Sequence, residues 1–201
     1  MDLSMSWLKD YVDIDVDIKD FVEDITLTGS KVEGWSEIGG ELSGIVTGKV
    51  LKIEKHPNAD RLVICTVDIG KDEPLIIVTH APNVFEGAYV CVALDGATLA
   101  GGIEIHDTDF RGVMSYGMMC SVEEMGFDRN DFPEAPENGI YIFQNEVPLG
   151  KDVCDVMDLK DKVVEFEITS NRPDCFSTVG LAREVAATYN KEFKYPEIEV
   201  K

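Results

Sequence analysis

Positive charge is concentrated in residues 49–61, although the chain as a whole carries a formal net charge of −21. Cationic side chains held on a strand and the loop after it could bind phosphates, because each neutralised phosphate releases counterions. A solvated hairpin with ordinary surface charge is the alternative. The basic residues of this stretch are Lys49, Lys52, Lys55 and Arg61, and its acidic residues are Glu54 and Asp60.

A second stretch, residues 110–121, combines glycine with side chains that donate hydrogen bonds. Gly112 lets the backbone approach whatever packs against it. Arg111 and Ser115 can donate to a phosphate or a ribose. Met118 suits either the hydrophobic core or a soft surface against a base.

No residue pattern predicts a catalytic centre or a metal site. The sequence lacks a GxxxxGK[ST] phosphate loop, an HExxH helix, a GxSxG elbow and a GxGxxG turn after a strand. Its three histidines are 24 and 26 residues apart, so we expect solvated loop histidines rather than a metal triad. A nucleophilic pair of Cys120 with His80 is compatible with the spacing, but each cysteine lies in or beside an apolar strand. We therefore predict no catalytic residue, no metal ligand and no cofactor in this chain.

The composition is that of a soluble globular protein. The 201 residues are 44% hydrophobic and 28% charged, which suits one large domain or two small ones. Apolar runs are too short to span a membrane, and the N-terminus lacks the pattern of a secretion signal. Five cysteines without a CxxC pair predict reduced thiols in a core. We expect a cytoplasmic protein whose acidic surface repels polyanions on average.

Three segments differ in pattern and are divided at glycines: residues 1–39, 40–150 and 151–201. The first is predicted to be helical, with Ser6 and Asp17 as N-caps of two helices, and to end in an extended stretch at residues 31–35. The middle segment has an alternating strand at residues 45–53, then short β runs and frequent glycines, which are typical of a small closed barrel.

The last segment is predicted to contain a strand at residues 163–168 and then a helix capped by Asp174 or Ser177. Within the middle segment, Ser121 and Glu124 form a capping box that predicts one helical turn. Because neither flank can bury a core alone, we expect one domain built from both flanks, with the barrel inserted between them.

Motifs of the middle segment resemble, in order, the tRNA-binding OB-fold that several aminoacyl-tRNA synthetases carry. They are His56-Pro57-Asn58-Ala59-Asp60-Arg61-Leu62, Ala81-Pro82-Asn83-Val84, and Arg111-Gly112-Val113-Met114-Ser115-Tyr116-Gly117-Met118-Met119-Cys120-Ser121. The resemblance implies a five-stranded barrel that holds the outside of tRNA with limited sequence preference. Together with the cations of the basic stretch, the candidate tRNA contacts are Lys49, Lys52, Lys55, His56, Asn58, Arg61, Arg111, Ser115 and Met118.

The flanks are similar to the N-terminal region of the β subunits of bacterial phenylalanyl-tRNA synthetases. The matching motifs are Ser6-Trp7-Leu8-Lys9-Asp10-Tyr11-Val12 and Glu167-Ile168-Thr169-Ser170-Asn171-Arg172-Pro173-Asp174-Cys175. The resemblance implies an α+β, multi-domain fold in which the OB-fold barrel is inserted into a small split helical domain with a winged-helix-like architecture. The last segment would also begin the connection to a following editing region.

In that family the region is non-catalytic and assists the docking of phenylalanine acceptor tRNA. The family resemblance places aminoacylation on the α subunit of an α2β2 assembly, and it implies ATP and magnesium for the complete enzyme only. No DNA or membrane partner is expected. The acidic balance favours an alternative, a structural or protein-interaction module without RNA contact. RNA binding requires the few cations to gather on one face.

Overall fold

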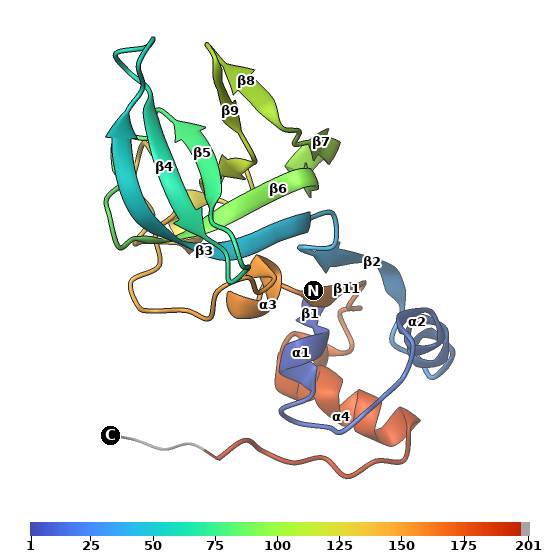
Figure 1. Cartoon of the computed structure of the whole chain (residues 1–201). Coiled ribbons are helices and arrows are strands. Elements are labelled where there is room, and N and C mark those ends of the chain that lie inside the picture. The colour runs from blue at the N-terminus through green and yellow to red at the C-terminus, as the bar shows by residue number, and fades with distance from the viewer. Residues whose placement is uncertain (198–201) are drawn as a thin grey trace. The chain divides into compact units, whose positions relative to one another are not determined.

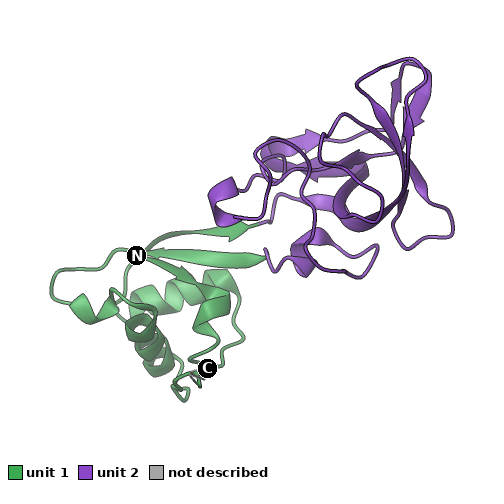
Figure 2. Cartoon of the chain, turned by 90° about the vertical axis from the view of Figure 1, so that its left-hand side faces the viewer, with its two compact units in different colours: residues 1–38, 160–201 green, residues 39–159 purple. Residues whose placement is uncertain are grey.

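The chain builds one unit from its two ends and a second unit from its middle, as Figures 1 and 2 show. The computed structural model describes residues 1–197, so the end of the last predicted segment, residues 198–201, lies outside the described residues. Unit 1 comprises residues 1–38 and the chain from residue 160 onward, and unit 2 comprises residues 39–159. Both units mix sheet with a few short helices, which agrees with the predicted mixed α and β content.

Unit 1 contains an antiparallel sheet of strand order β1-β11-β2. The N-caps of its two longer helices follow the sequence prediction, because Asp17 accepts from the Lys19 N–H and Ser177 accepts from the Gly180 N–H. The elements are β1 (Asp2–Ser4), α1 (Met5–Leu8), α2 (Ile18–Leu27), β2 (Val32–Ile38), β11 (Asp161–Phe166), the 3-10 turn η3 (Pro173–Cys175) and α4 (Thr178–Thr188).

The sheet of unit 1 confirms the extended stretch predicted at residues 31–35, most of which lies in β2, but its strand β1 was not predicted. Residues before α1 form a strand because Leu3 pairs with Val164, and both side chains are fully buried. Ser4 caps α1 in place of Ser6, whose backbone N–H and hydroxyl both donate to Asp161. The helices and the sheet share one apolar core, which includes Leu3, Leu8, Val12, Phe21, Ile25, Val164, Phe166, Leu181 and Val185.

Unit 2 is dominated by a curved antiparallel sheet of order β10-β6-β3-β4-β5, with β7 paired to β6. Its strands are β3 (Ser43–Lys55), β4 (Val63–Asp68), β5 (Leu75–Thr79), β6 (Tyr89–Leu99), β7 (Ile103–Glu104), β8 (Thr108–Phe110), β9 (Val113–Ser115) and β10 (Met118–Met119). Short helical turns are η1 (Ala100–Gly102), η2 (Arg129–Asp131) and α3 (Val153–Val156).

The two ends of this strand order are hydrogen-bonded to each other through the segment between β9 and β10. The Tyr116 N–H donates to the Ile76 carbonyl at 2.8 Å, and the Val78 N–H donates to Ser115 Oγ at 3.0 Å. Residues 115 and 116 are therefore hydrogen-bonded to β5, and β10, which follows them directly, is paired with β6. Two apolar clusters fill the interior, one around Ile45 and the other around Val50.

The boundaries of the middle unit differ from the predicted 40–150. The unit begins at Gly39 and continues to Leu159. The continuation has a local cause, since the Thr47 N–H donates to the Lys151 carbonyl at 2.8 Å and Val153 is buried in the cluster around Ile45. Residues 151–159 thus belong to the unit of the inserted sheet.

Candidate nucleic-acid interface

The β8–β9 hairpin carries one half of the candidate interface. Phe110 pairs with Val113, so Arg111 and Gly112 form a two-residue turn. Both have positive φ, 54° and 93°, as a type I′ hairpin turn requires. Asp109 Oδ1 accepts from the Gly112 N–H at 3.0 Å and holds the turn from inside the hairpin. Arg111 therefore occupies a backbone conformation that a non-glycine residue adopts only when its neighbours enforce it.

The loop between β3 and β4 carries the other half, and hydrogen bonds join it to the hairpin. His56 Nε2 donates to the Phe110 carbonyl at 2.7 Å, while His56 Nδ1 accepts from the Asn58 N–H at 3.1 Å. Asn58 Nδ2 donates to the Arg111 carbonyl at 2.9 Å, and Arg111 Nη1 donates to the Asn58 carbonyl at 3.2 Å. We call residues 56–61 together with the hairpin of residues 108–115 the loop–hairpin junction. Figure 1 shows the β3–β4 loop and the β8–β9 hairpin at the same end of unit 2.

His56 is not the solvated loop histidine that the sequence predicted. Its exposed fraction is 6%, and both ring nitrogens have backbone partners. These partners fix the neutral tautomer that carries its proton on Nε2. The imidazole is thus a bridge between two chain segments, while Asn58 beside it stays exposed.

The predicted cations divide into two groups. Lys49 lies over the Tyr89 ring, 4.8 Å from its centroid, with its ammonium 3.1 Å from the phenol oxygen. Lys52 pairs with Glu54 at 3.0 Å. Within residues 1–197, by contrast, no carboxylate lies within 4.0 Å of the side-chain nitrogens of Lys55, Arg61 or Arg111.

Among the candidate cations, the three without a carboxylate or phenol partner are the ones in or directly beside the loop–hairpin junction. Lys55 ends β3, Arg61 closes the loop and Arg111 is at the hairpin turn, and all three are exposed. Asp60 and Asp109 also belong to the junction, but neither forms an ion pair with these cations among the described residues. The junction therefore presents two guanidinium groups to solvent on a hydrogen-bonded scaffold, with the Lys55 ammonium beside it.

Two other predicted contacts have structural roles. Ser115 is buried, and its hydroxyl accepts from the Val78 N–H while it donates to the Gly117 carbonyl at 2.8 Å. This hydroxyl links β9 to β5 and is not available to a ligand. Met118 is half-buried and packs against the core cluster around Ile45, so it fills space in the interior.

Two residues of the site were not predicted from the sequence. Asp109 holds the hairpin turn by accepting from the Gly112 N–H, and the Tyr89 hydroxyl accepts a hydrogen bond from the Lys49 ammonium. An aspartate three residues before a glycine was the available signal for the turn. The pairing of Lys49 with Tyr89 joins β3 to β6 and had no local signal.

The cysteines are core residues, as predicted. All five are free and buried, and burial raises the pKa of the Cys65 thiol to about 11 and that of Cys120 to about 12. Among residues 1–197, no group of three or more His, Cys, Asp or Glu side chains could hold a metal ion. No helix in this described part is both long enough and apolar enough to cross a bilayer.

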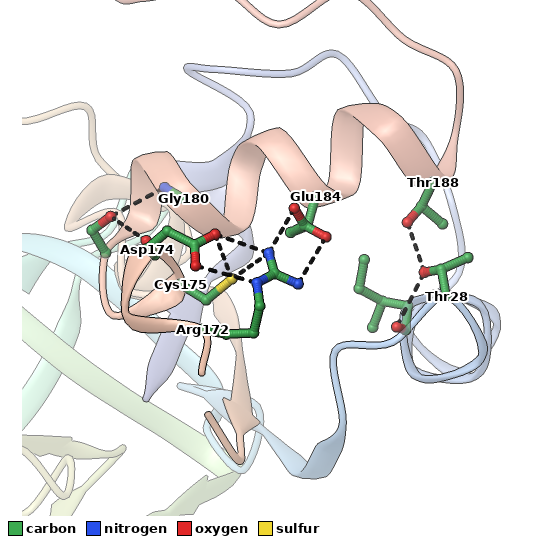
Figure 3. Close-up of polar contacts among 9 residues, drawn as sticks. Thr28, Arg172, Asp174, Cys175, Gly180, Glu184 and Thr188 are labelled. Carbon is green, nitrogen blue, oxygen red and sulfur yellow. Dashed lines mark hydrogen bonds and ion pairs between the residues drawn. The ribbon is translucent and has the colours of Figure 1, made fainter. Parts of the chain in front are cut away.

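In unit 1, the Asn-Arg-Pro-Asp motif of residues 171–174 has a structural role, because its arginine and aspartate belong to a cluster of ion pairs (Figure 3). Arg172 donates to both Asp174 oxygens, at 3.2 and 2.9 Å, and pairs with Glu184 at 2.8 Å. The hydrogen bonds from Arg172 are the main reason that the pKa of Asp174 falls to about 2. The cluster joins η3 to α4, which agrees with the predicted turn and helix start.

Comparison with known proteins then identifies the middle unit. The model of a family described as "Putative tRNA binding domain" matches residues 45–152. The chain belongs to this family. The matched region contains the whole loop–hairpin junction and all the sheet of unit 2 except the first residues of β3.

Relatives extend the match to both flanks. Over 99% of this chain, 48% of residues are identical to the phenylalanine–tRNA ligase β subunit of Clostridium acetobutylicum, and over 98%, 47% are identical to that of Staphylococcus haemolyticus. Each match covers 25% of the relative, so the chain spans about a quarter of the length of these curated relatives. These relatives confirm the resemblance that the flanking motifs indicated.

A solved structure aligns with the chain more loosely. The MetRS-related protein from Pyrococcus horikoshii covers 69% of this chain and 96% of its own, at 19% identity and a TM-score of 0.37.

Proposed function

We propose that this chain is the tRNA-docking part of a phenylalanine–tRNA ligase β subunit. In this proposal unit 2 is an OB-fold barrel, inserted into a split unit 1 of winged-helix-like architecture. The match of the tRNA-binding family model to residues 45–152 supports the proposal most directly. The closed hydrogen-bond path through Tyr116 is what a small barrel requires.

The docking surface in this proposal is the loop–hairpin junction with Lys55. Arg61, Arg111 and Lys55 contact phosphates of the tRNA backbone, because these cations have no carboxylate partner among the described residues. The guanidinium groups suit this task, since their planar donors match phosphate oxygens. The remaining acidic surface repels RNA, so we expect weak binding with limited sequence preference.

The complete ligase would attach phenylalanine to tRNA with ATP and magnesium, in an α2β2 assembly in the cytoplasm. For this chain itself we propose a docking role without a catalytic step and without a cofactor of its own. Its partners in the proposal are the acceptor tRNA and the α subunit.

Binding of phenylalanine acceptor tRNA to the 201-residue chain tests the proposal. Affinity is measured at several salt concentrations for the unmodified chain and for the variants Arg61→Glu, Lys52→Glu and Lys71→Glu. Loss of one phosphate contact lowers the salt slope by about 1, which we expect for Arg61→Glu. Lys52→Glu should have a smaller effect, because Glu54 already offsets the Lys52 charge.

Lys71→Glu is the matched control for the change of charge. Lys71 is exposed in the connection between β4 and β5, at the opposite end of β4 from the junction. A strand of this length separates the two ends by about 20 Å, beyond the Debye length of about 8 Å at physiological salt. Equal losses in Arg61→Glu and Lys71→Glu would show that only the total charge matters. No binding at any salt concentration would favour the protein-interaction module instead.

A further inference from the structure

The loop–hairpin junction contains two polar residues whose hydrogen bonds hold other residues in place. His56 and Asn58 were expected to contact RNA, yet the His56 ring is buried and both of its nitrogens are occupied. Asn58 uses its amide nitrogen to hold the Arg111 carbonyl. The two His56 ring nitrogens are therefore not free to bind a phosphate, and the Asn58 amide nitrogen already uses one of its two N–H donors inside the junction.

Arg111 needs this support more than an ordinary surface residue does. Its φ of 54° is unfavourable for a residue with a side chain, so the turn persists only where neighbours enforce it. Asp109 enforces the turn from within the hairpin, and Asn58 does so from the facing loop. In return, the Arg111 guanidinium donates to the Asn58 carbonyl, so the loop and the turn restrain each other.

We infer that His56 and Asn58 are positioning residues, which fix the distance between the Arg61 and Arg111 side chains before RNA arrives. This inference rests on the proposed function of the junction. A loose loop would have to be ordered during binding, and that ordering weakens affinity. The two residues therefore increase affinity without adding a phosphate contact, and the junction recognises the spacing of two backbone phosphates.

The first test compares the tRNA affinity and salt slope of Asn58→Ala and His56→Ala with those of Arg61→Ala. Loss of one or two hydrogen bonds corresponds to a loss of affinity of about 3- to 10-fold for each of the first two variants. Their salt slopes should equal that of the unmodified chain, because no phosphate contact is removed. Arg61→Ala should lower the slope by about 1.

A double-mutant cycle separates positioning from direct contact. If Asn58 acts through Arg111, the Asn58→Ala change should alter affinity by less than about twofold when it is made in Arg111→Ala. Tyr141→Phe is the matched control, because it removes a single hydrogen bond elsewhere in unit 2, from the Tyr141 hydroxyl to Glu134 at 2.9 Å. This control should leave tRNA affinity unchanged, which shows that loss of stability alone does not weaken binding.

Amide hydrogen exchange of residues 108–115 gives a readout that does not depend on RNA. The inference predicts slow exchange at the turn in the unmodified chain and faster exchange there in Asn58→Ala. Faster exchange with unchanged affinity would overturn the inference, because positioning would then have no effect on binding. A lower salt slope in Asn58→Ala, or an undiminished effect in Arg111→Ala, would make Asn58 a direct contact and also overturn it. If the unmodified chain binds no tRNA while its turn exchanges slowly, the proposed function fails, and the positioning role falls with it.

Discussion

Replacement of Asp161 should separate the hydrogen-bonding role of its carboxylate from its charge. Asp161 begins β11, and its carboxylate accepts four hydrogen bonds from β1, α1 and its own strand. Oδ1 accepts from the backbone N–H groups of Ser6 and Lys162, at 3.0 and 2.7 Å. Oδ2 accepts from the hydroxyls of Ser4 and Ser6. The residue thus ties the N-terminal strand and first helix to the strand that returns from the inserted unit.

The expected loss of stability follows from these four contacts. A hydrogen bond contributes about 0.5–1.5 kcal/mol net, and the lower end applies because the carboxyl is partly exposed to water. Asp161→Ala should therefore lower the free energy of unfolding by about 2 kcal/mol. Asp161→Asn should cost less than about 1 kcal/mol, because Asn keeps an oxygen for the two N–H groups and its amide can donate to the two hydroxyls.

The same contacts predict a dependence on pH. Burial raises the pKa of Asp161, but the hydrogen bonds from Ser4, Ser6 and Lys162 together outweigh it and hold that pKa below its usual value. A carboxyl with a lowered pKa in the folded state adds stability that is fully present above its unfolded pKa. This stability disappears as the pH falls through the folded pKa. The difference between the unmodified chain and Asp161→Asn should therefore shrink at acidic pH.

Urea denaturation followed by tryptophan fluorescence measures this effect in unit 1 alone. The sequence has two tryptophans, Trp7 and Trp35, and both lie in unit 1. Asp15→Ala is the matched control, because Asp15 is an exposed carboxylate of the same unit and its replacement should change stability by less than about 0.5 kcal/mol. If Asp161→Ala and Asp15→Ala unfold at the same urea concentration, the four contacts do not stabilise the unit and the reasoning is refuted.

Three further predictions concern the interface, a close approach and the thiols. Asp60→Asn should increase tRNA affinity about 2- to 5-fold in the same binding assay, because it removes a negative charge from the junction; weaker binding would contradict this. Gly180→Ala should destabilise unit 1 by more than about 2 kcal/mol in the fluorescence assay, since its Cβ would lie 1.8 Å from the Asp174 carbonyl oxygen. A thiol reagent should label none of the five buried cysteines in the native chain and all five after denaturation, and rapid native labelling would show that the cores open.

Local sequence patterns predicted most of the regular structure. Alternating residues anticipated β3 and short apolar runs anticipated β4, β5 and β6, because these strands pack on the apolar clusters of unit 2. The capping box was also confirmed, since the Ser121 N–H donates to Glu124 at 2.7 Å and the Glu124 N–H donates to Ser121 at 3.2 Å. These features depend on residues within a few positions of one another, which a sequence displays directly.

Features that depend on distant partners were not predictable in this way. β1 is three residues long, and it is a strand because β11, far along the chain, offers it a pairing edge. Burial of His56 depends on the Phe110 carbonyl, 54 residues later. The unit boundary at Leu159 likewise depends on Thr47, whose backbone bonds residue 151. Short polar segments carry too little periodicity to reveal such pairings.

Ion-pair partners of the candidate cations were likewise not predictable from the sequence. The sequence placed four of the candidate cations on a strand and the loop after it, but it could not show which of the five had partners. Lys52 is offset by a carboxylate two residues away, whereas Arg61 and Arg111 are brought to one junction without such a carboxylate among the described residues. At physiological salt, charges more than about 8 Å apart are largely screened from each other. A net charge of −21 therefore opposes the approach of RNA without cancelling the contacts that we propose at the junction. In the proposed docking role, RNA affinity depends on how rigidly a few unpaired cations are held, and the His56 bridge is one of the contacts that hold them.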